Sequence, residues 1–386
     1  MRLPLIVLTA CLAPAAAAQT IPTVRLAKPD ATFAEPFSRV VGFREIARGR
    51  VVIADELEDN VALLDFAGGG VTTIGRQGGG PGEFGSPGPL LALPGDTTIM
   101  SDFGNRRALV IGPDGQVITT LPLREMGGSV MNPRWADARG RLYGQPPLMF
   151  SGNTGGGLPE IPDSMPLLRW DRSTDRVDTA LMVPNPLAGG GGAVMMVRAA
   201  GRTGGPDVRG NRQKAFYPAD AFAVGPDGRI AVVRADDYHV EWIDAAGRKT
   251  VGRAIAYERI RVTKADQDAW IKNRFAGTRM VVNGRRMTPP AIDPKDVDWA
   301  EFKPPFMAGV TVTPEGELWV PASQPASAKG SLFDVFDNRG ERIRQVRLPE
   351  GRRLVGFGRG VLYAVHKDAD DLEWLERYRR PADDDR

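Results

Sequence analysis

The stretch IGRQGGGPGEFGSP at residues 74–87 has glycine or proline at eight of its fourteen positions. Proline lacks a backbone donor, and glycine loses more conformational entropy on ordering than any other residue, so the stretch suits neither a helix interior nor a central strand. Strand-like apolar runs flank it at residues 70–74 and 88–93. We therefore interpret it as the connection between two similar β units, with Glu83 and Phe84 as the large side chains that anchor it.

One strand pattern recurs six times along the chain on either side of this connection. In each copy a tight glycine turn leads into an alternating apolar strand, as in PDGRIAVV at residues 226–233. The six marker glycines are Gly49, Gly95, Gly140, Gly228, Gly316 and Gly360. Subtraction of their numbers gives steps of 46, 45, 88, 88 and 44 residues, and the short steps have the length of a propeller blade. Because most turns are preceded by another strand-like run and followed by a second hairpin, each unit reads as antiparallel strands A, B, C and D.

These units predict an all-β fold, a six-bladed β-propeller with four-stranded antiparallel blades. The two long steps would alternatively hide two degenerate blades, but they contain no further copy of the pattern. We expect insertions there, including one short helical insertion at residues 263–275, with Thr263 as N-cap and with Ala265, Trp270, Ile271 and Phe275 buried. After the last C strand the chain has no D strand left, so we predict that the N-terminal strand at residues 23–27 closes the last blade and removes its exposed edge.

The N-terminus has the composition of a secretory signal peptide at residues 1–18, with Arg2, an apolar run and small residues before the cleavage site. A single propeller domain at residues 19–381 and a disordered tail at residues 382–386 are expected to follow. No later apolar run reaches the about 18 residues of a membrane span, so we expect an exported periplasmic or extracellular protein. Cys11 is the one cysteine of the chain; because LTAC at residues 8–11 is similar to a bacterial lipobox, a lipoprotein anchored through Cys11 is the alternative.

Residues 74–76, 82–84 and 87, followed by DFGNRR at residues 102–107 and a Pro-Asp-Gly hairpin, resemble the NHL-repeat pattern. The wider chain resembles the secreted, six-bladed, TolB-like propellers of bacteria. The resemblance is sharp over residues 41–123, and elsewhere only the rhythm of strands and turns persists. It implies a scaffold that binds proteins, peptides, sugars or nucleic acid, with some relatives acting as lactonases, lyases or strictosidine-synthase-like enzymes. The fold therefore does not imply one function.

The lengths of the connections predict which face of the propeller works. In an antiparallel four-stranded blade, A–B and C–D turns lie on one face of the ring, and B–C and D–A connections lie on the other. Every long segment belongs to the second class, namely residues 76–87, 145–165, 184–217, 257–307 and 321–330. Long loops on a rigid scaffold are the usual place for binding, so this face is predicted to hold a ligand site.

Charge indicates what kind of partner this face takes. The net charge of +3 is not gathered into a Lys/Arg block, which argues against nucleic acid. The insertions at residues 184–217 and 257–307 are rich in arginine, which suits an anionic ligand, although ordinary solvated surface charge is the alternative. We expect a monomer that binds an unknown protein or an anionic small molecule without catalysis.

Several polar residues at the predicted loop ends of the strands are candidates for the site. Asp55, Asp102 and Asp236 are predicted to end B strands, where their carboxylates would either ligate a divalent cation such as Ca²⁺ or accept backbone N–H groups in Asx turns. No other cofactor is expected. The two histidines lack zinc-site spacing, but either could act as a general base with Asp237 or Asp368. The ligand-binding candidates are Arg76, Asp102, Arg106, Asp236, His239, Arg274 and His366. The alternative function is a lactonase-like hydrolase or lyase with a metal-assisted site over the central channel.

Overall fold

The computed structural model describes residues 21–102, 104–126, 129–146, 162–185, 195–198, 207–210, 213–274, 280–282, 285–287 and 291–381. The expected signal peptide and the C-terminal tail lie outside these residues. Within them, no helix is both long and apolar enough to cross a membrane.

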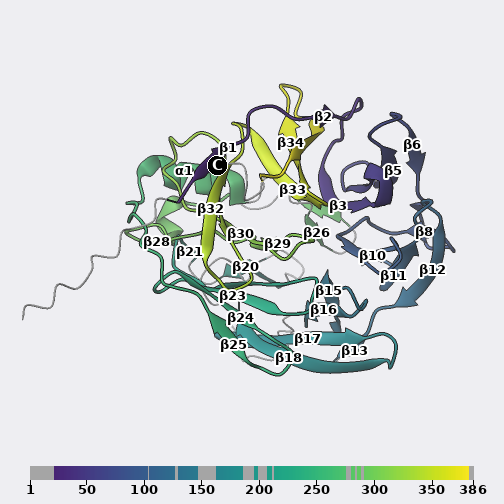
Figure 1. Ribbon diagram of the computed structural model, residues 1–386, viewed down its shortest axis with the longest axis horizontal. Helices are drawn as coiled ribbons and strands as arrows, with labels where there is room; N and C mark the ends of the chain where they lie inside the picture. The colour runs from purple at the N-terminus through teal and green to yellow at the C-terminus, as the bar shows by residue number, and fades with distance from the viewer. Residues whose placement is uncertain are drawn as a thin grey trace, which may run out of the picture.

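Six β-sheets follow one another around a ring, and the chain colours run in order around it (Figure 1). Blade one comprises β3 (Val40–Ile46), β4 (Arg50–Asp55), β5 (Asn60–Asp65) and β6 (Val71–Thr73). Blade two comprises β9 (Leu90–Ala92), β10 (Thr98–Asp102), β11 (Arg107–Ile111) and β12 (Val117–Pro122). Blade three comprises β15 (Asn132–Ala136), β16 (Leu142–Gln145), β17 (Ser164–Asp171) and β18 (Arg176–Pro184).

The second half of the ring repeats this order of strands. Blade four comprises β22 (Ala221–Val224), β23 (Ile230–Arg234), β24 (His239–Ile243) and β25 (Lys249–Val251). Blade five comprises β29 (Thr311–Val312), β30 (Leu318–Pro321), β31 (Leu332–Phe336) and β32 (Arg342–Arg347). Blade six comprises β33 (Arg352–Gly358), β34 (Val361–Lys367), β35 (Glu373–Arg379) and β2 (Ala31–Thr32). The predicted six-bladed propeller of four-stranded antiparallel blades is confirmed.

The six marker glycines lie in the A–B turns, as predicted. All six have a positive φ, between 68° at Gly360 and 91° at Gly316. Side chains with a Cβ rarely adopt this left-handed conformation, and the turns are tight because glycine permits it. The repeated pattern therefore indicates the positive φ that the A–B turn needs once in every blade.

An N-terminal strand closes the ring, but it is not the strand at residues 23–27, so that assignment was wrong. The closing strand is β2, which pairs antiparallel with β35 through Ala31↔Arg377 and Thr32↔Glu376, where the purple and yellow ends of the chain meet (Figure 1). The alternating run at residues 23–27 supplies β1 (Thr23–Arg25), which pairs in parallel with β32 as a fifth strand of blade five. A two-residue strand such as β2 is too short to show any alternation in the sequence.

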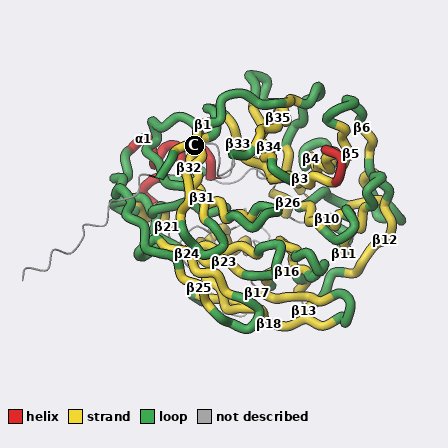
Figure 2. Tube along the Cα trace, viewed as in Figure 1, coloured by secondary structure: helices red, strands yellow, loops and turns green. Residues whose placement is uncertain are grey.

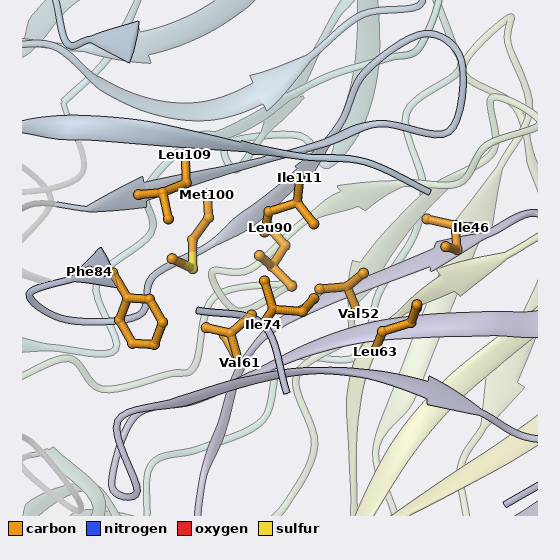
Figure 3. Packing of buried hydrophobic residues seen from close by; sticks show 11 residues of the cluster. Ile46, Val52, Val61, Leu63, Ile74, Phe84, Leu90, Met100, Leu109 and Ile111 are labelled. Atoms are coloured by element: carbon orange, nitrogen blue, oxygen red, sulfur yellow. The ribbon is translucent and has the colours of Figure 1, made fainter. Parts of the chain in front are cut away.

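The hydrophobic core is divided into six clusters, one between each pair of neighbouring blades. The cluster between blades one and two joins Val52 and Val61 to Met100 and Leu109, and it also includes Phe84 from the connection at residues 74–87 (Figure 3). Phe84 is 1% exposed, so the predicted apolar anchor of this connection is confirmed. Because the clusters follow each other around the ring, each blade is buried on both faces.

The five long segments belong to the connection classes predicted for them. Residues 145–165 and 321–330 join B to C strands, and the other three segments join D to A strands. They carry short elements of their own: β7 (Arg76–Gln77), β8 (Glu83–Phe84), β19 (Met195–Arg198), β20 (Asp207–Gly210), β21 (Gln213–Ala215), α1 (Lys264–Arg274), β26 (Met280–Val282), β27 (Arg285–Met287), η2 (Pro294–Asp296) and β28 (Val297–Trp299). The remaining elements are η1 (Ala47–Gly49), β13 (Glu125–Met126) and β14 (Ser129–Val130). A parallel pairing of β21 with β28 joins two of the insertions.

The predicted helix is confirmed as α1, the one long helical segment of the described trace (Figure 2). Thr263 caps it: the Asp266 carboxylate accepts from the Thr263 backbone N–H at 2.9 Å, and Thr263 Oγ1 accepts from the Asp266 backbone N–H at 3.3 Å. The predicted burial was wrong at Ala265, which is exposed, while Trp270 and Ile271 are half-buried; Phe275 lies outside the described residues. Asp266 is the buried residue of α1, so a polar contact takes the central place in docking the helix, beside the half-buried Trp270 and Ile271.

We predict that two marker glycines respond differently to the same substitution. Gly360 has no atom within 4 Å of an added Cβ, whereas at Gly228 the Cβ would lie 3.0 Å from Asp137 Oδ2 and 3.2 Å from the Tyr143 hydroxyl. Gly360→Ala should lower the free energy of unfolding by about 1–2 kcal/mol because of its positive φ alone. Gly228→Ala should lower it by roughly a further 1–3 kcal/mol because the packed turn must move. Chemical denaturation measures both, and equal losses would contradict the packing described for Gly228.

Candidate functional site

A cavity of about 530 Å³ lies where blades three and four meet the insertions. Its wall includes Trp135 on β15 and Phe222 on β22, which are first strands of their blades, and Trp270 on α1. The segment from Pro304 to Val310, which leads into β29 of blade five, completes it. The cavity therefore lies on the face that carries the long connections, the face on which the sequence predicts a ligand site.

Aromatic rings make up much of the cavity wall. They are Trp135, Phe216, Tyr217, Phe222, Trp270 and Phe306. Trp135 and Phe222 pack against each other with their ring centroids 5.2 Å apart, which joins the inner strands of blades three and four. Trp299 supports the opposite wall, since its ring lies 5.5 Å from Trp270 and 6.3 Å from Phe216. Contacts of this kind fix the direction of each ring, so the wall is largely preformed.

Two cations of the wall have no carboxylate partner within the part of the chain that the structure describes. Arg134 and Lys214 are both exposed and both line the cavity. The Lys214 ammonium lies 5.3 Å from the centre of the Tyr217 ring. The wall also contains Asp220, but its carboxylate accepts from Arg234 and from the backbone N–H of Ala235, each at 2.8 Å. The cavity therefore keeps a positive charge that the described residues do not neutralise.

A buried ion pair holds α1 against the rest of the insertions. Lys303 Nζ lies 2.6 Å from Asp266 Oδ1, and the two side chains are only 8% and 2% exposed. Lys303 also donates to the carbonyl of Gln324 at 2.6 Å and lies 5.4 Å from the Phe216 ring. One ammonium group thus contacts three separate long connections, at residues 184–217, 257–307 and 321–330, and fixes the part of the wall that Trp270 supplies.

The pKa of Asp266 reflects this arrangement. Burial alone would raise the pKa of its carboxyl, but the hydrogen bonds from Lys303 and Thr263 outweigh burial and hold the pKa below its ordinary value. Opposite charge and hydrogen bonding to the ionised form both act in this direction. The carboxylate form is therefore favoured by folding.

Asp55 and Asp102 occupy equivalent positions and hold loops together. The Asp55 carboxylate accepts from the backbone N–H groups of Ser38 and Leu57, at 2.7 and 3.0 Å. Asp102 accepts from the backbone N–H of Gly85 at 2.9 Å and from the Asn105 side chain at 2.8 Å. Each carboxylate thus ties the connection before its blade to the B–C turn of the same blade, which is the Asx-type alternative considered from the sequence.

The assignment of Asp236 to the same position was wrong. Asp55 pairs with Asn60 and Asp102 with Arg107 at the ends of their strands, and the equivalent pair in blade four is Arg234↔His239. Asp236 lies two residues further on, in the turn, and is exposed. Spacing from the marker glycine could not show this, because the last apolar residue of β23 is followed by Arg234 rather than by an aspartate.

The two histidines lie on the same face but in different blades. His239 begins β24, and its Nδ1 lies 2.5 Å from Asp237 Oδ1. His366 lies near the end of β34 in blade six. The Asp368 carboxylate accepts instead from Trp374 Nε1 at 2.7 Å, and this hydrogen bond is the main reason why the pKa of Asp368 is lowered. Of the two predicted His–Asp pairs, the first is joined by a hydrogen bond, whereas His366 acts on Asp368 through its charge.

The predicted arginines lie at three different places. Arg76 is 81% exposed and pairs with Glu83 at 2.7 Å within the first connection. Arg106 is exposed in the B–C turn of blade two with a φ of 54°. Arg274 ends α1, with its guanidinium 5.4 Å from the Trp270 ring, and donates to Gln213 at 3.4 Å. None of the seven candidates chosen from sequence is among the residues that line the cavity, and their roles in binding stay predictions.

The described residues offer no group of three or more His, Cys, Asp or Glu side chains that could hold a metal ion. Asp55 and Asp102 already accept several hydrogen bonds, and Asp220 pairs with Arg234. These donor sets do not fit the several oxygen ligands that Ca²⁺ takes, so no chemical step is derived through a metal.

Sequence reasoning missed most residues of the cavity wall. Trp270 was expected to be buried in the helix, but Trp135, Phe222 and Phe306 were not singled out. Trp135 lies on β15, Phe222 on β22 and Phe306 in the segment before β29, so no local spacing connects them. Aromatic residues within A strands or in the segments that precede them are the signal that could have indicated them.

We predict that the Asp266–Lys303 pair stabilises the docked helix at neutral pH and that this stabilisation is lost in acid, where the Asp266 carboxylate is protonated. The folded pKa of Asp266 is below its ordinary value of 3.8, so its stabilisation is complete above that value and is lost as the pH falls through the lower, folded pKa. At neutral pH, Asp266→Asn should cost about 3–5 kcal/mol of helix docking because it leaves a buried ammonium unpaired. Amide hydrogen exchange of residues 264–274 measures this loss. The difference in protection between the variant and the natural protein should shrink as the pH falls towards 3.

Asp268→Asn is the matched control, because Asp268 is exposed on the same helix and pairs with Lys264. A surface pair of this kind contributes only about 0–1 kcal/mol. Equal loss of protection in the two variants, or a difference that does not depend on pH, would contradict the role given to Asp266.

Comparison with known proteins gives likeness only at the level of solved structures. No protein-family model matches the chain, and no curated protein matches it by sequence. A calcium-binding regucalcin from Agrobacterium tumefaciens is 11% identical with a TM-score of 0.43, covering 93% of this chain and 98% of its own. A gluconolactonase from Xanthomonas campestris is 12% identical with a TM-score of 0.44, covering 90% and 88%. A virginiamycin B lyase from Staphylococcus aureus is 11% identical with a TM-score of 0.37, covering 91% and 87%. At these values the likeness carries no inference about activity.

Proposed function

We propose that this chain is an exported propeller that binds an anionic small molecule in the cavity of its insertion-bearing face and does not transform it. Export rests on the signal-like composition of residues 1–18, and the NHL and TolB-like character rests on the pattern at residues 74–107. The observation that carries the binding function is the cavity itself. Its volume of about 530 Å³ lies within the roughly 300–1,000 Å³ that is usual for small-molecule sites.

The contacts of the wall support a site that is ready to bind. Blades three and four contribute rings that already pack on each other, and the Asp266–Lys303 pair fixes the helix that contributes Trp270. A wall held in this way loses little conformational entropy when a ligand enters, which leaves more of the contact energy for affinity.

The composition of the wall supports binding rather than chemistry. Among the described residues that line the cavity, Asp220 is the one carboxylate, and there is no histidine, serine or cysteine. Asp220 is held by Arg234 and the Ala235 backbone. Lys214 and Tyr217 are the other titratable side chains of the described wall, and the Lys214 ammonium packs on the Tyr217 ring. A covalent mechanism needs a nucleophile beside a base, and Asp220 is already engaged by other partners.

One observation favours the alternative, a hydrolase or lyase. Nδ1 of His239 contacts Asp237. Arg234 donates both to Glu241, which lies next to this histidine, and to Asp220 in the cavity wall. A histidine oriented by a carboxylate is a suitable general base. Acid release from gluconolactone or another lactone, with or without added Ca²⁺, that disappears in His239→Gln would favour this reading over the proposed one.

We predict that filling the cavity abolishes binding of a fluorescent probe. 8-Anilinonaphthalene-1-sulfonate has an apolar body and an anionic group, and its emission rises in an apolar site. Ala308 is exposed and lines the cavity, so Ala308→Trp should fill the space without disturbing the core. Saturable binding by the natural protein should weaken about tenfold or more, equivalent to at least ~1.4 kcal/mol.

Ala245→Trp is the control, because Ala245 is exposed in the C–D turn of blade four, on the opposite face. It should bind the probe as the natural protein does. If Ala308→Trp binds equally well, or the natural protein shows no saturable binding, the cavity is not the ligand site.

A further inference from the structure

We infer that the cavity selects a planar aromatic carboxylate, whose ring lies between the aromatic side chains and whose carboxylate meets Arg134 and Lys214. This inference rests on the proposed function, and it adds the chemical class of the ligand.

The wall favours a flat ring over other apolar shapes. Five of its six aromatic side chains, Trp135, Phe216, Tyr217, Phe222 and Trp270, are half-buried rather than buried. Half-buried rings keep part of their surface for a ligand, and aromatic surfaces interact best with another ring in stacked or edge-to-face geometry. The rings come from strands of two blades, from the segment after β21 and from α1, so a ligand between them would meet rings on more than one side.

Charge favours an anion over a neutral ring. Arg134 and Lys214 come from separate parts of the wall, β15 and β21, and neither has a carboxylate partner within the described residues. The carboxylate of the wall, Asp220, is already neutralised by Arg234 at 2.8 Å. An unpaired cation beside apolar surface binds a carboxylate through charge-assisted hydrogen bonds, which are about twice as strong as neutral ones.

The distribution of polarity sets the orientation. The charged side chains of Arg134 and Lys214 are exposed, whereas Phe306 is buried and the other rings are half-buried. The carboxylate would therefore lie at the opening and the ring deeper.

Matched probes test the class of ligand by calorimetric titration of the full-length protein. 2-Naphthoate carries both features, 2-naphthamide keeps the ring and loses the charge, and cyclohexanecarboxylate keeps the charge and loses the aromatic ring. Glucuronate represents sugar acids, which also pack on aromatic side chains. We expect 2-naphthoate to bind roughly tenfold to a hundredfold more tightly than 2-naphthamide, as for the loss of a charged hydrogen bond. Cyclohexanecarboxylate and glucuronate should bind more weakly than 2-naphthoate.

Charge-removing variants test the residues. Lys214→Met and Arg134→Met keep most of the apolar stem and should each weaken 2-naphthoate binding about tenfold while leaving 2-naphthamide unchanged. Arg259→Met is the control, because Arg259 belongs to the same insertion face but stacks on Phe302 at 4.1 Å and does not line the cavity. It should bind both probes as the natural protein does.

The outcomes separate this inference from the proposed function. Equal affinity for 2-naphthoate and 2-naphthamide, both lost in Ala308→Trp, would leave the cavity as a binding site and overturn the anionic class. Tighter binding of cyclohexanecarboxylate or glucuronate than of 2-naphthoate would overturn the aromatic class. If the protein binds the fluorescent probe in the cavity but does not bind 2-naphthoate, the ligand class inferred here is wrong and the proposed function stands. If it binds neither the fluorescent probe nor 2-naphthoate, both the ligand class and the proposed function are wrong.

Discussion

The buried ion pair between Asp266 and Lys303 is the interaction on which the candidate site depends. A charged pair that is almost fully enclosed must compensate a large desolvation cost, and it does so here with further hydrogen bonds from Thr263 and to the Gln324 carbonyl. Such pairs often add little net stability compared with apolar packing, and here the pair holds the helix in one geometry. In this protein that geometry brings three long connections to one point and holds α1 beside the ends of blades three to five.

The propeller supplies the rigid base on which this arrangement rests. Its six apolar clusters lie between blades, so every blade is stabilised by both neighbours and ring closure by β2 completes the series. The first strands of the blades are therefore held mainly by contacts between blades, and the long connections add single anchors to these clusters, such as Phe84 and Phe306.

The sequence was informative about features that repeat or that have a local signature, such as α1 with its Thr263 cap, and uninformative about features that depend on contacts between distant segments. Each marker glycine, such as Gly228, indicates a turn that needs a positive φ, and the alternation of the strand after it indicates which side chains are buried. The closing strand β2 is two residues long, and the cavity wall joins residues as distant as Trp135 and Phe306. Both depend on tertiary proximity, which no spacing along the chain records. The docked face of α1 was also missed, because an acidic residue, Asp266, is the one that is buried.

The end of the B strand in blade four connects the scaffold with the site. In blades one and two, an aspartate at the end of the B strand, Asp55 or Asp102, accepts from the connection that precedes the blade. In blade four the acid lies on that connection instead, as Asp220, and Arg234 takes the strand end and pairs with it. The connection before the blade is again tied to the end of the B strand, but here the acid lies on the connection and its partner lies on the strand. Because Asp220 lies in the cavity wall, the exchange neutralises the acid that would otherwise oppose an anion, while Arg134 and Lys214 stay available. The aspartate ends the B strand in blades one and two only, and the other four B strands end at Gln145, Arg234, Pro321 and Lys367. The exchange in blade four is therefore one of several solutions at this position, and it is the one that lies in the cavity wall.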